Sequence, residues 1–319
     1  MSQVLAALDR KGQVILHGPP GTGKTRLALS AALAVADRAD AIDAGPAERV
    51  AALRELLDDV PSSDHGAPLV TMTTFHPSLG YEDFVEGYKP HETGEAGLSL
   101  QLTDGLFTVL CTAAEADPGH TYLLVVDEIN RADLPRVLGE LITLLEPDKR
   151  GLPVRLPVSG RSFRVPANLW IIGTMNTADR SVAHLDAALR RRFGFVLVPP
   201  DPTAVDGSVG ALDLSAFLAE LNGRISKQLD RDRQVGQAFL LQEDMPVESA
   251  DQLNAAFYHD IAPLLEDYAL GDVELLARLL GAELVDPGSG QIAALEPDDL
   301  AVTLAKEFGA GIDTDVDSA

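Results

Sequence analysis

The sequence is short of several residue types, and each shortage excludes a class of protein. Cys111 is the only cysteine among 319 residues, so no disulfide can form within the chain and a reducing compartment is expected. Because no histidine is adjacent in sequence, we interpret this cysteine as a core residue rather than a catalytic thiol. Apolar runs such as 123–126 are too short to cross a bilayer, and Asp9, Arg10 and Lys11 interrupt any N-terminal signal. We therefore expect a cytoplasmic protein with no membrane contact.

Basic residues are scarce as well. The chain has 25 Lys and Arg residues against 49 Asp and Glu residues, which gives a formal net charge of −24. A protein that binds nucleic acid by itself usually presents a basic face. The net negative charge of this chain instead repels phosphate. We expect any contact with DNA to come through partner chains or through a local positive patch, such as one lining the pore of a ring.

Against these shortages, one motif is complete: GPPGTGKT at residues 18–25. It follows the apolar run 14–16 and precedes the helix-prone run 26–32, the strand-loop-helix order of a phosphate-binding loop. In such a loop glycine N–H groups surround the phosphates, Lys24 reaches the β and γ oxygens, and the Thr25 hydroxyl is placed to bind Mg²⁺. The predicted nucleotide-binding residues of the loop are Gly18, Pro19, Pro20, Gly21, Thr22, Gly23, Lys24 and Thr25. A turn without a ligand is disfavoured, because Lys24 would then be an unpaired cation at a helix N-terminus.

Two carboxylates end a second apolar run, at 121–128, which is typical of a buried parallel strand whose carboxyl end faces a ligand. A strand and a helix separate this run from the loop, so we expect that it can lie beside the first strand. Asp127 is predicted to hold Mg²⁺ together with Thr25, and Glu128 to deprotonate the attacking water. The alternative is a pair of solvated carboxylates, a common pattern where no phosphate-binding loop accompanies it.

A third apolar strand, at 169–175, ends in MNTADRS. An uncharged amide in that place can hold a water against a terminal phosphate, and we assign this role to Asn176. Two interpretations of Asp179 and Arg180 stay open. They form an ion pair at the start of the next helix, or they have a role in catalysis or subunit contact.

Three arginines, Arg190, Arg191 and Arg192, end a predicted helix. A helix C-terminus favours cations, so a purely structural interpretation exists. The favoured interpretation is an arginine finger that stabilises charge on the nucleotide of a neighbouring subunit. Arg191 and Arg192 are preferred for this role.

The order of predicted elements indicates an α/β protein with a smaller helical region. Beyond the strands above, we predict strands at 69–75 and 195–198, a hairpin around Ser159-Gly160, and a helix at 134–145. After residue 200 helical periodicity dominates, at 214–229, 250–267, 272–283 and 298–308. The predicted domains are therefore 1–200 and 201–308, and 309–319 is predicted to be a disordered tail.

Four segments together resemble one family. They are similar to segments of the McrB family of AAA+ motors. The four segments are GPPGTGKT (18–25), FHPSLGYEDFVEGYKP (75–90), VVDEINRADLPRVLGELITLLEPDKRG (125–151) and MNTADRSVAHLDAALRRRF (175–193). The resemblance implies an AAA+ P-loop NTPase with a parallel-sheet core and a C-terminal helical lid, which hydrolyses GTP with Mg²⁺ in a restriction or defence complex. It also implies a homo-hexamer with nucleotide at subunit interfaces, an McrC-like nuclease or activator partner, and roles for Asn130 and Arg131 near the active site.

Two departures from the family matter. Family members usually carry an N-terminal domain that recognises modified DNA, whereas about a dozen residues precede the first strand here. We therefore expect either that DNA recognition comes from another chain or that the substrate is not modified DNA. Gln237 stands where related sequences often have histidine, which leaves contact between the lid and the nucleotide open. The sequence signature by which small GTPases recognise guanine is absent. The prediction of GTP as the substrate therefore rests on the family resemblance, and ATP stays an alternative substrate. The alternatives are a MoxR-like ATPase that remodels proteins, and an assembly platform with negligible turnover.

Overall fold

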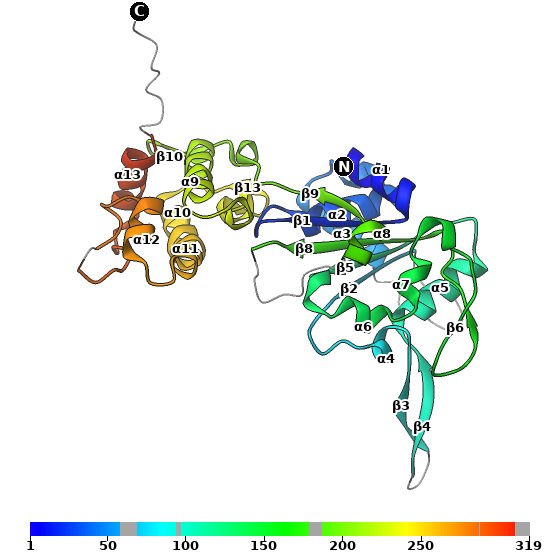
Figure 1. Ribbon diagram of the computed structural model, residues 1–319. Coiled ribbons are helices and arrows are strands. Elements are labelled where there is room, and N and C mark those ends of the chain that lie inside the picture. The colour runs from blue at the N-terminus through cyan, green and yellow to red at the C-terminus, as the bar shows by residue number, and fades with distance from the viewer. Residues whose placement is uncertain (58–68, 94–96, 179–186, 287, 310–319) are drawn as a thin grey trace, which may run out of the picture. The chain divides into compact units, whose positions relative to one another are not determined.

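The computed structural model describes residues 1–57, 69–93, 97–178, 187–286 and 288–309 (Figure 1). They form two compact units, the first made of Met1–His17 with Lys24–Leu197, the second of Gly18–Gly23 with the chain from Val198. The chain therefore passes from one unit to the other inside the phosphate-binding loop.

Two predictions fall outside the described residues. Asp179 and Arg180 lie in the segment 179–186, and nearly all of the tail predicted at 309–319 lies in 310–319. Both stay predictions.

A five-stranded sheet forms the centre of the first unit, in the order β2-β5-β8-β1-β9 (Figure 1). Its strands are β1 (Gln13–Gly18), β2 (Val70–Thr74), β5 (Tyr122–Asp127), β8 (Leu169–Asn176) and β9 (Gly194–Leu197). The pairs β2–β5, β5–β8 and β1–β9 are parallel, so the predicted strands and the α/β class are confirmed. The expectation that the strand ending at Asp127 can lie beside the first strand is wrong, because β8 lies between β5 and β1.

The first unit also contains helices. They are α1 (Ser2–Lys11), α2 (Lys24–Val35), α3 (Pro46–Leu57), α4 (Tyr81–Phe84), α5 (Leu106–Ala116), α6 (Leu134–Leu138), α7 (Leu141–Leu144) and α8 (Ala187–Arg192), with 3-10 turns η1 (Ala39–Ala41), η3 (Ile129–Arg131) and η4 (Pro147–Lys149). Sequence reasoning missed α1. The single helix predicted at 134–145 is two helices, since Gly139 between them has a φ of 52°, outside the helical range.

The core of the first unit is apolar and continuous. It contains the β5 residues Leu124 and Val126, the α5 residues Phe107 and Leu110, and the single cysteine. Cys111 is 1% exposed, and burial raises the pKa of its thiol, so its prediction as a core residue is confirmed.

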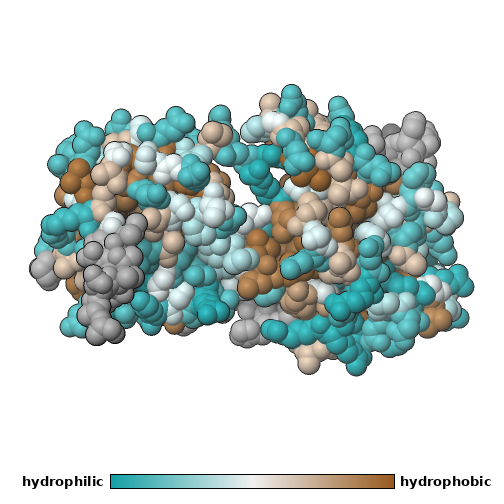
Figure 2. Space-filling model, turned by 90° about the horizontal axis from the view of Figure 1, so that it is seen from above, coloured by the Kyte–Doolittle hydropathy of each residue, from teal (hydrophilic) through white to brown (hydrophobic). Residues whose placement is uncertain are grey.

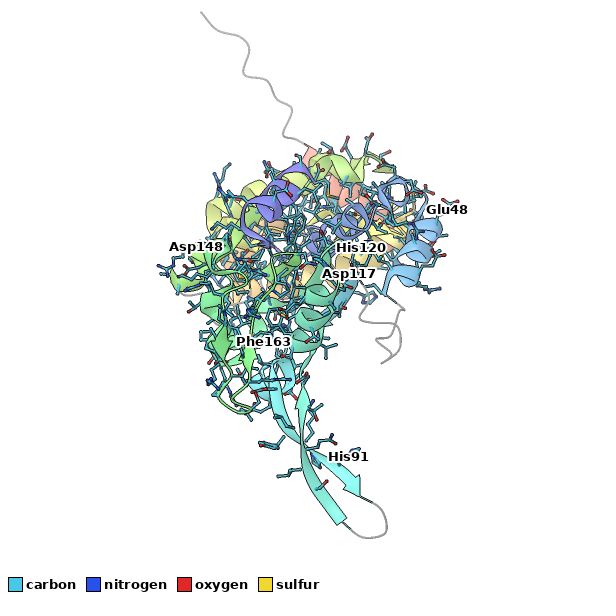
Figure 3. All side chains as sticks on the ribbon, turned by 90° about the vertical axis from the view of Figure 1, so that its right-hand side faces the viewer. Glu48, His91, Asp117, His120, Asp148 and Phe163 are labelled. Atoms are coloured by element: carbon cyan, nitrogen blue, oxygen red, sulfur yellow. The ribbon has the colours of Figure 1, made fainter. Side chains whose placement is uncertain are left out.

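Two hairpins interrupt the α/β pattern of the first unit. The long one pairs β3 (Glu86–Thr93) with β4 (Gly97–Asp104) in antiparallel register, and the short one pairs β6 (Val154–Arg155) with β7 (Ser162–Phe163). The short hairpin was predicted, whereas the long one was not. In Figure 3 the long hairpin, with His91 labelled, projects away from the sheet.

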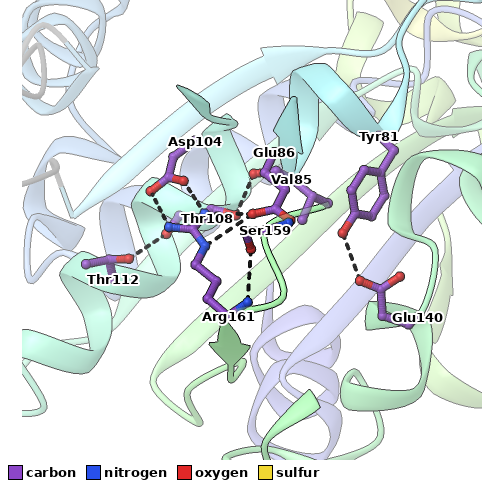
Figure 4. A network of polar contacts seen from close by, with 9 residues as sticks. All are labelled: Tyr81, Val85, Glu86, Asp104, Thr108, Thr112, Glu140, Ser159 and Arg161. Carbon is purple, nitrogen blue, oxygen red and sulfur yellow. Dashed lines mark hydrogen bonds and ion pairs between the residues drawn. The ribbon is translucent and has the colours of Figure 1, made fainter. Parts of the chain in front are cut away.

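One buried carboxylate joins the bases of these hairpins (Figure 4). Glu86 is 0% exposed, accepts a hydrogen bond from the Ser159 N–H at 2.9 Å, and pairs with Arg161 at 3.1 Å. Arg161 also pairs with Asp104 at the end of β4. The Tyr81 hydroxyl donates to Glu140 at 2.8 Å and so ties the start of this region to the junction between α6 and α7.

The second unit is mainly helical. Its helices are α9 (Leu214–Gln228), α10 (Ala250–Ala256), the π-helix η8 (Phe257–Ile261), α11 (Ala262–Ala269), α12 (Val273–Leu280) and α13 (Pro297–Phe308). It also contains two short strand pairs, β10 (Ser208–Val209) with β11 (Leu212–Asp213) and β12 (Leu241–Gln242) with β13 (Met245–Pro246). The 3-10 turns of this unit are η5 (Pro202–Val205), η6 (Arg231–Arg233) and η7 (Gln237–Leu240). The helix predicted at 250–267 is thus interrupted by a π-helical turn. A separate apolar core, centred on Phe217, Leu221 and Phe257, holds the helices together.

The face seen in Figure 2 is largely hydrophilic, with smaller apolar patches on each unit. Within the described residues, no helix combines the length and the apolar character needed to cross a membrane.

Candidate functional site

Polar side chains gather in the first unit where β5 and β8 end. The two strands are parallel neighbours, paired from Tyr122 with Leu169 to Val126 with Gly173. Their carboxyl ends therefore meet at the same edge of the sheet, which is where ligands bind in open α/β sheets. This register brings together the predicted residues Asp127, Glu128 and Asn176.

Asp127 lies at the end of β5 and accepts two hydroxyl hydrogen bonds. The Thr25 Oγ1 donates to its Oδ1 at 2.9 Å, and the Thr174 Oγ1 donates to the same oxygen at 2.5 Å. A hydroxyl and a carboxylate are oxygen ligands of the kind that Mg²⁺ prefers. Thr25 and Asp127 therefore fit the metal predicted for them.

Sequence reasoning missed Thr174. Its side chain is buried, and besides donating to Asp127 it accepts the Glu128 N–H at 3.1 Å. One hydroxyl thus fixes both carboxylate residues. The available signal was a hydroxyl residue inside the apolar strand LWIIGTMN, two positions before Asn176.

Glu128 has a left-handed backbone with a φ of 53°. Its Oε1 accepts a hydrogen bond from the Asn176 amide at 2.6 Å, and its Oε2 lies 3.5 Å from the Arg131 Nε. The predicted base and the predicted water-holding amide are therefore in direct contact. A water bound to both groups would be held by an acceptor and a donor at once.

Asn130 and Arg131 follow in η3. Asn130 is 4% exposed, and its amide donates to the Asn176 carbonyl in a long contact of 3.5 Å. Within the described part of the chain, its Oδ1 is buried with no hydrogen-bond partner. Arg131 lies on the carboxylate of Glu128, so both residues border the predicted site.

Lys24 begins α2 and is 6% exposed. Burial lowers the pKa of its ammonium to about 8, although the carboxylates of Glu128 and Asp127 act in the opposite direction. A buried cation near two carboxylates would gain further stabilisation from an anionic ligand. Lys24 is therefore suited to a phosphate.

The first six residues of the loop belong to the second unit. Gly21 has a φ of 74°, and a Cβ there would lie 2.6 Å from the Phe239 ring, so only glycine fits. The Gly236 N–H donates to the Pro20 carbonyl at 3.0 Å, and the Ala238 N–H donates to the Gly21 carbonyl at 2.9 Å. The glycine-rich half of the motif is thus held by main-chain contacts.

The arginines of α8 lie in the first unit. Arg192 is 5% exposed and pairs with Glu146 at 2.7 Å, which makes it part of the interior. Arg191 pairs with the same carboxylate at 2.9 Å, yet two thirds of its side chain is exposed. Arg190 is exposed and lies over the Phe195 ring at 5.7 Å. Sequence reasoning missed Glu146, the counter-ion shared by two of the three.

Two family models match separate parts of the chain. The model described as the AAA domain of the dynein-related subfamily matches residues 53–193, and the model described as the McrB alpha-helical lid domain matches residues 213–277.

Two curated restriction proteins are similar to the chain. The type IV methyl-directed restriction enzyme EcoKMcrB subunit of Escherichia coli (strain K12) is 34% identical over 295 residues, which are 84% of this chain and 56% of that protein. The type II restriction enzyme BsuMI component YdiS of Bacillus subtilis (strain 168) is 25% identical over 221 residues, which are 55% of this chain and 64% of that protein. The chain thus spans between half and two thirds of the length of these relatives. A solved structure from Cytophaga hutchinsonii, 15% identical, aligns over 88% of this chain and 67% of its own with a TM-score of 0.36, too low to carry an argument.

Proposed function

The chain belongs to the McrB family of AAA+ proteins, and on that premise we propose that it hydrolyses nucleoside triphosphates, GTP before ATP, as the motor of a restriction complex. One observation supports this proposal above the others. Where β5 and β8 end, the Thr25 hydroxyl donates to Asp127 at 2.9 Å, and the Asn176 amide donates to Glu128 at 2.6 Å. A metal-binding pair and a water-activating pair are therefore adjacent, as phosphoryl transfer to water requires.

Each residue has a defined part in the proposed hydrolysis. Thr25 and Asp127 hold Mg²⁺, which when bound neutralises charge on the phosphates. Lys24 contacts the β and γ oxygens as a cation. Asn176 orients the attacking water, and Glu128 takes its proton.

Asn130 and Arg131 have positioning parts in this proposal. Asn130 contacts the Asn176 carbonyl, and Arg131 holds the second carboxylate oxygen of Glu128. Removal of either contact would let the base or the amide rotate away from the water.

The proposed assembly is a homo-hexamer in which an arginine reaches the nucleotide of the neighbouring copy. Arg191 is the best supported candidate, since it lies in the last turn of α8 and two thirds of its side chain is exposed. Arg192 would have to leave the interior and the carboxylate of Glu146 to act in the same way. The proposed partner is an McrC-like nuclease or activator, with DNA contacted through partner chains or the pore.

The test is phosphate release from GTP and from ATP, measured with the chain alone and with an McrC-like subunit added. GTP preference with stimulation by that subunit supports the proposal. ATP preference without stimulation contradicts it and favours a remodelling ATPase that acts on proteins.

A trans-acting arginine has a separate test. Arg191→Ala should lose most hydrolysis, by about 10³-fold or more, since an arginine finger contributes that much to turnover. Mixing it with Lys24→Ala should restore part of the activity, because one mutant supplies the finger and the other an intact nucleotide site. No recovery in the mixture would contradict action between subunits. Arg10→Ala is a control for the loss of one cation from the first unit.

A further inference from the structure

The second unit holds the phosphate-binding loop through a short lid segment, Gly236 to Phe239. The segment is itself anchored to α9, because both polar atoms of the Asn222 side chain bond to Val235. Its amide donates to the Val235 carbonyl at 2.8 Å, and its oxygen accepts the Val235 N–H at 2.7 Å. Asn222 is 4% exposed, so this anchor lies within the core of the lid.

Four consecutive carbonyls of the loop accept hydrogen bonds inside this unit. The Pro19 carbonyl accepts from the Thr22 hydroxyl at 3.1 Å, Pro20 from the Gly236 N–H, Gly21 from the Ala238 N–H, and Thr22 from the Gln237 side chain at 3.0 Å. The last three donors all come from the lid segment.

The direction of these carbonyls fixes the direction of the N–H groups. In a planar trans peptide, the carbonyl of one residue and the N–H of the next point to opposite sides. Carbonyls of Pro20, Gly21 and Thr22 that face the lid segment therefore turn the N–H groups of Gly21, Thr22 and Gly23 away from it. A row of N–H groups turned to one side forms the concave nest that binds phosphate.

Gln237 is the one side chain among these donors, and both ends of its amide are used. Its Nε2 donates to the Thr22 carbonyl at 3.0 Å, and its Oε1 accepts the Asp201 N–H at 3.1 Å. Only this orientation of the amide satisfies both partners, because a carbonyl can only accept and a backbone N–H can only donate.

We propose that Gln237 is a positioning residue of the nucleotide site, which orients the Gly23 N–H for phosphate and ties the loop to the start of the second unit at Asp201. The side chain acts on the loop and not on the nucleotide, since both of its polar ends are occupied by the main chain. This proposal rests on the proposed function, because it needs a nucleotide in the loop.

The test compares two substitutions of glutamine by methionine in the lid. Gln237→Met keeps the length of the side chain and removes both contacts with the main chain. Gln234→Met, the matched control, removes a bond to Ser226 at 3.1 Å and leaves the contacts of the loop intact. Titration of fluorescent mant-GDP and mant-ADP gives the affinity of each variant, so that base preference does not decide the outcome.

We expect Gln237→Met to bind the nucleotide about five- to tenfold more weakly, because, of the two bonds lost, the one to Thr22 orients the loop. The loss should appear in the KM for hydrolysis, with kcat changed less than about twofold. Gln237→Glu keeps the acceptor for Asp201 but sets a carboxylate oxygen against the Thr22 carbonyl, so its loss of affinity should be at least as large. The control should bind like the wild type, and the thermal unfolding midpoints of nucleotide-free Gln237→Met and Gln234→Met should agree.

The outcomes separate the two proposals. Wild-type affinity in Gln237→Met overturns the positioning role, as does an equal loss in Gln234→Met with a lowered unfolding midpoint. If the wild-type chain binds neither mant-nucleotide, the proposed function itself fails, and this inference fails with it.

Discussion

The predicted nucleotide-binding residues differ in kind between the two units. In the first unit they are side chains: Lys24, Thr25, Asp127, Glu128 and Asn176 lie where parallel strands end. In the second unit they are main chain, because the glycine-rich residues 18–23 carry no charge and are held by their carbonyls. The charged members of this set therefore lie in the first unit, whereas those in the second unit act through the conformation of their backbone.

This difference predicts different responses to substitution. Changes in the first unit should affect the chemical step or the pH dependence of nucleotide affinity, and leave the conformation of residues 18–23 unchanged. Changes in the second unit should affect affinity, because they move N–H groups without removing any charge.

The largest effect is expected for Glu128→Gln in the first unit. The amide keeps the size of the side chain but cannot take a proton, so turnover should fall by about 10²–10⁴-fold, the usual contribution of general-base catalysis. Binding of mant-GDP should change by less than about threefold. Multiple-turnover phosphate release measures the first quantity, and unchanged release would remove Glu128 from the role of base.

The second effect belongs to the loop. A Cβ on Gly236 would lie 2.0 Å from the Gly21 carbonyl carbon, so Gly236→Ala must push the loop and the lid segment apart. Overpacking costs about 1–3 kcal/mol, and so close an approach indicates the upper end, which is about 100-fold in affinity. Nucleotide titration measures it.

Gly223→Ala is the control for this substitution. A Cβ at Gly223, inside α9, meets only the Glu220 Oε2 at 4.0 Å. Affinity should stay unchanged, and the free energy of unfolding should rise by about 0.5–1 kcal/mol, because alanine favours the helix. Equal affinities for Gly236→Ala and Gly223→Ala would mean that the lid segment does not shape the loop.

The third effect is a dependence on pH. The pKa of Lys24 is about 8 in the folded chain, against 10.5 for an ordinary lysine. Only the protonated form attracts phosphate, so affinity for mant-GDP in EDTA should be constant below pH 8 and fall tenfold per unit above it, about thirtyfold by pH 9.5. Lys24→Arg should bind with little pH dependence, since a guanidinium stays protonated.

Stability should change in the opposite direction over the same window. Between pH 8 and 10.5 the unfolded chain holds more protons at Lys24 than the folded chain, so the free energy of unfolding rises with pH. Urea unfolding of wild type and Lys24→Met at several pH values measures this contribution. A parallel fall of affinity and stability would show that general unfolding, and not Lys24, limits binding.

The sequence predicts the parts that depend on local pattern. The strands of the sheet, the loop motif and the helix that follows it were read correctly, because each is a short run with its own periodicity or glycine spacing. The long β3–β4 hairpin was missed. Its strands include Lys89 and Pro90 and project from the sheet, so burial imposes little alternation on them.

Contacts between distant residues could not be predicted in the same way. Gln237 and Thr22 are 215 positions apart, and Thr174 and Asp127 are 47 positions apart. The sequence around one residue of each pair therefore does not predict its hydrogen-bond partner. The neighbours of β5 were mistaken for the same reason, since strand order is decided by the packing of whole units. Glu146, the counter-ion of Arg191, likewise lies 45 positions before it, so the sequence of α8 does not indicate the pair.

The backbone of Glu128 has a consequence for how this protein can evolve. A left-handed φ of 53° costs a residue with a side chain about 1–3 kcal/mol, and glycine would relieve most of that strain. Glycine would also remove the carboxylate. If Glu128 is the base, as proposed, a glycine variant favoured by selection for stability alone would be inactive, and selection for turnover would have to outweigh that gain for the strained glutamate to be kept.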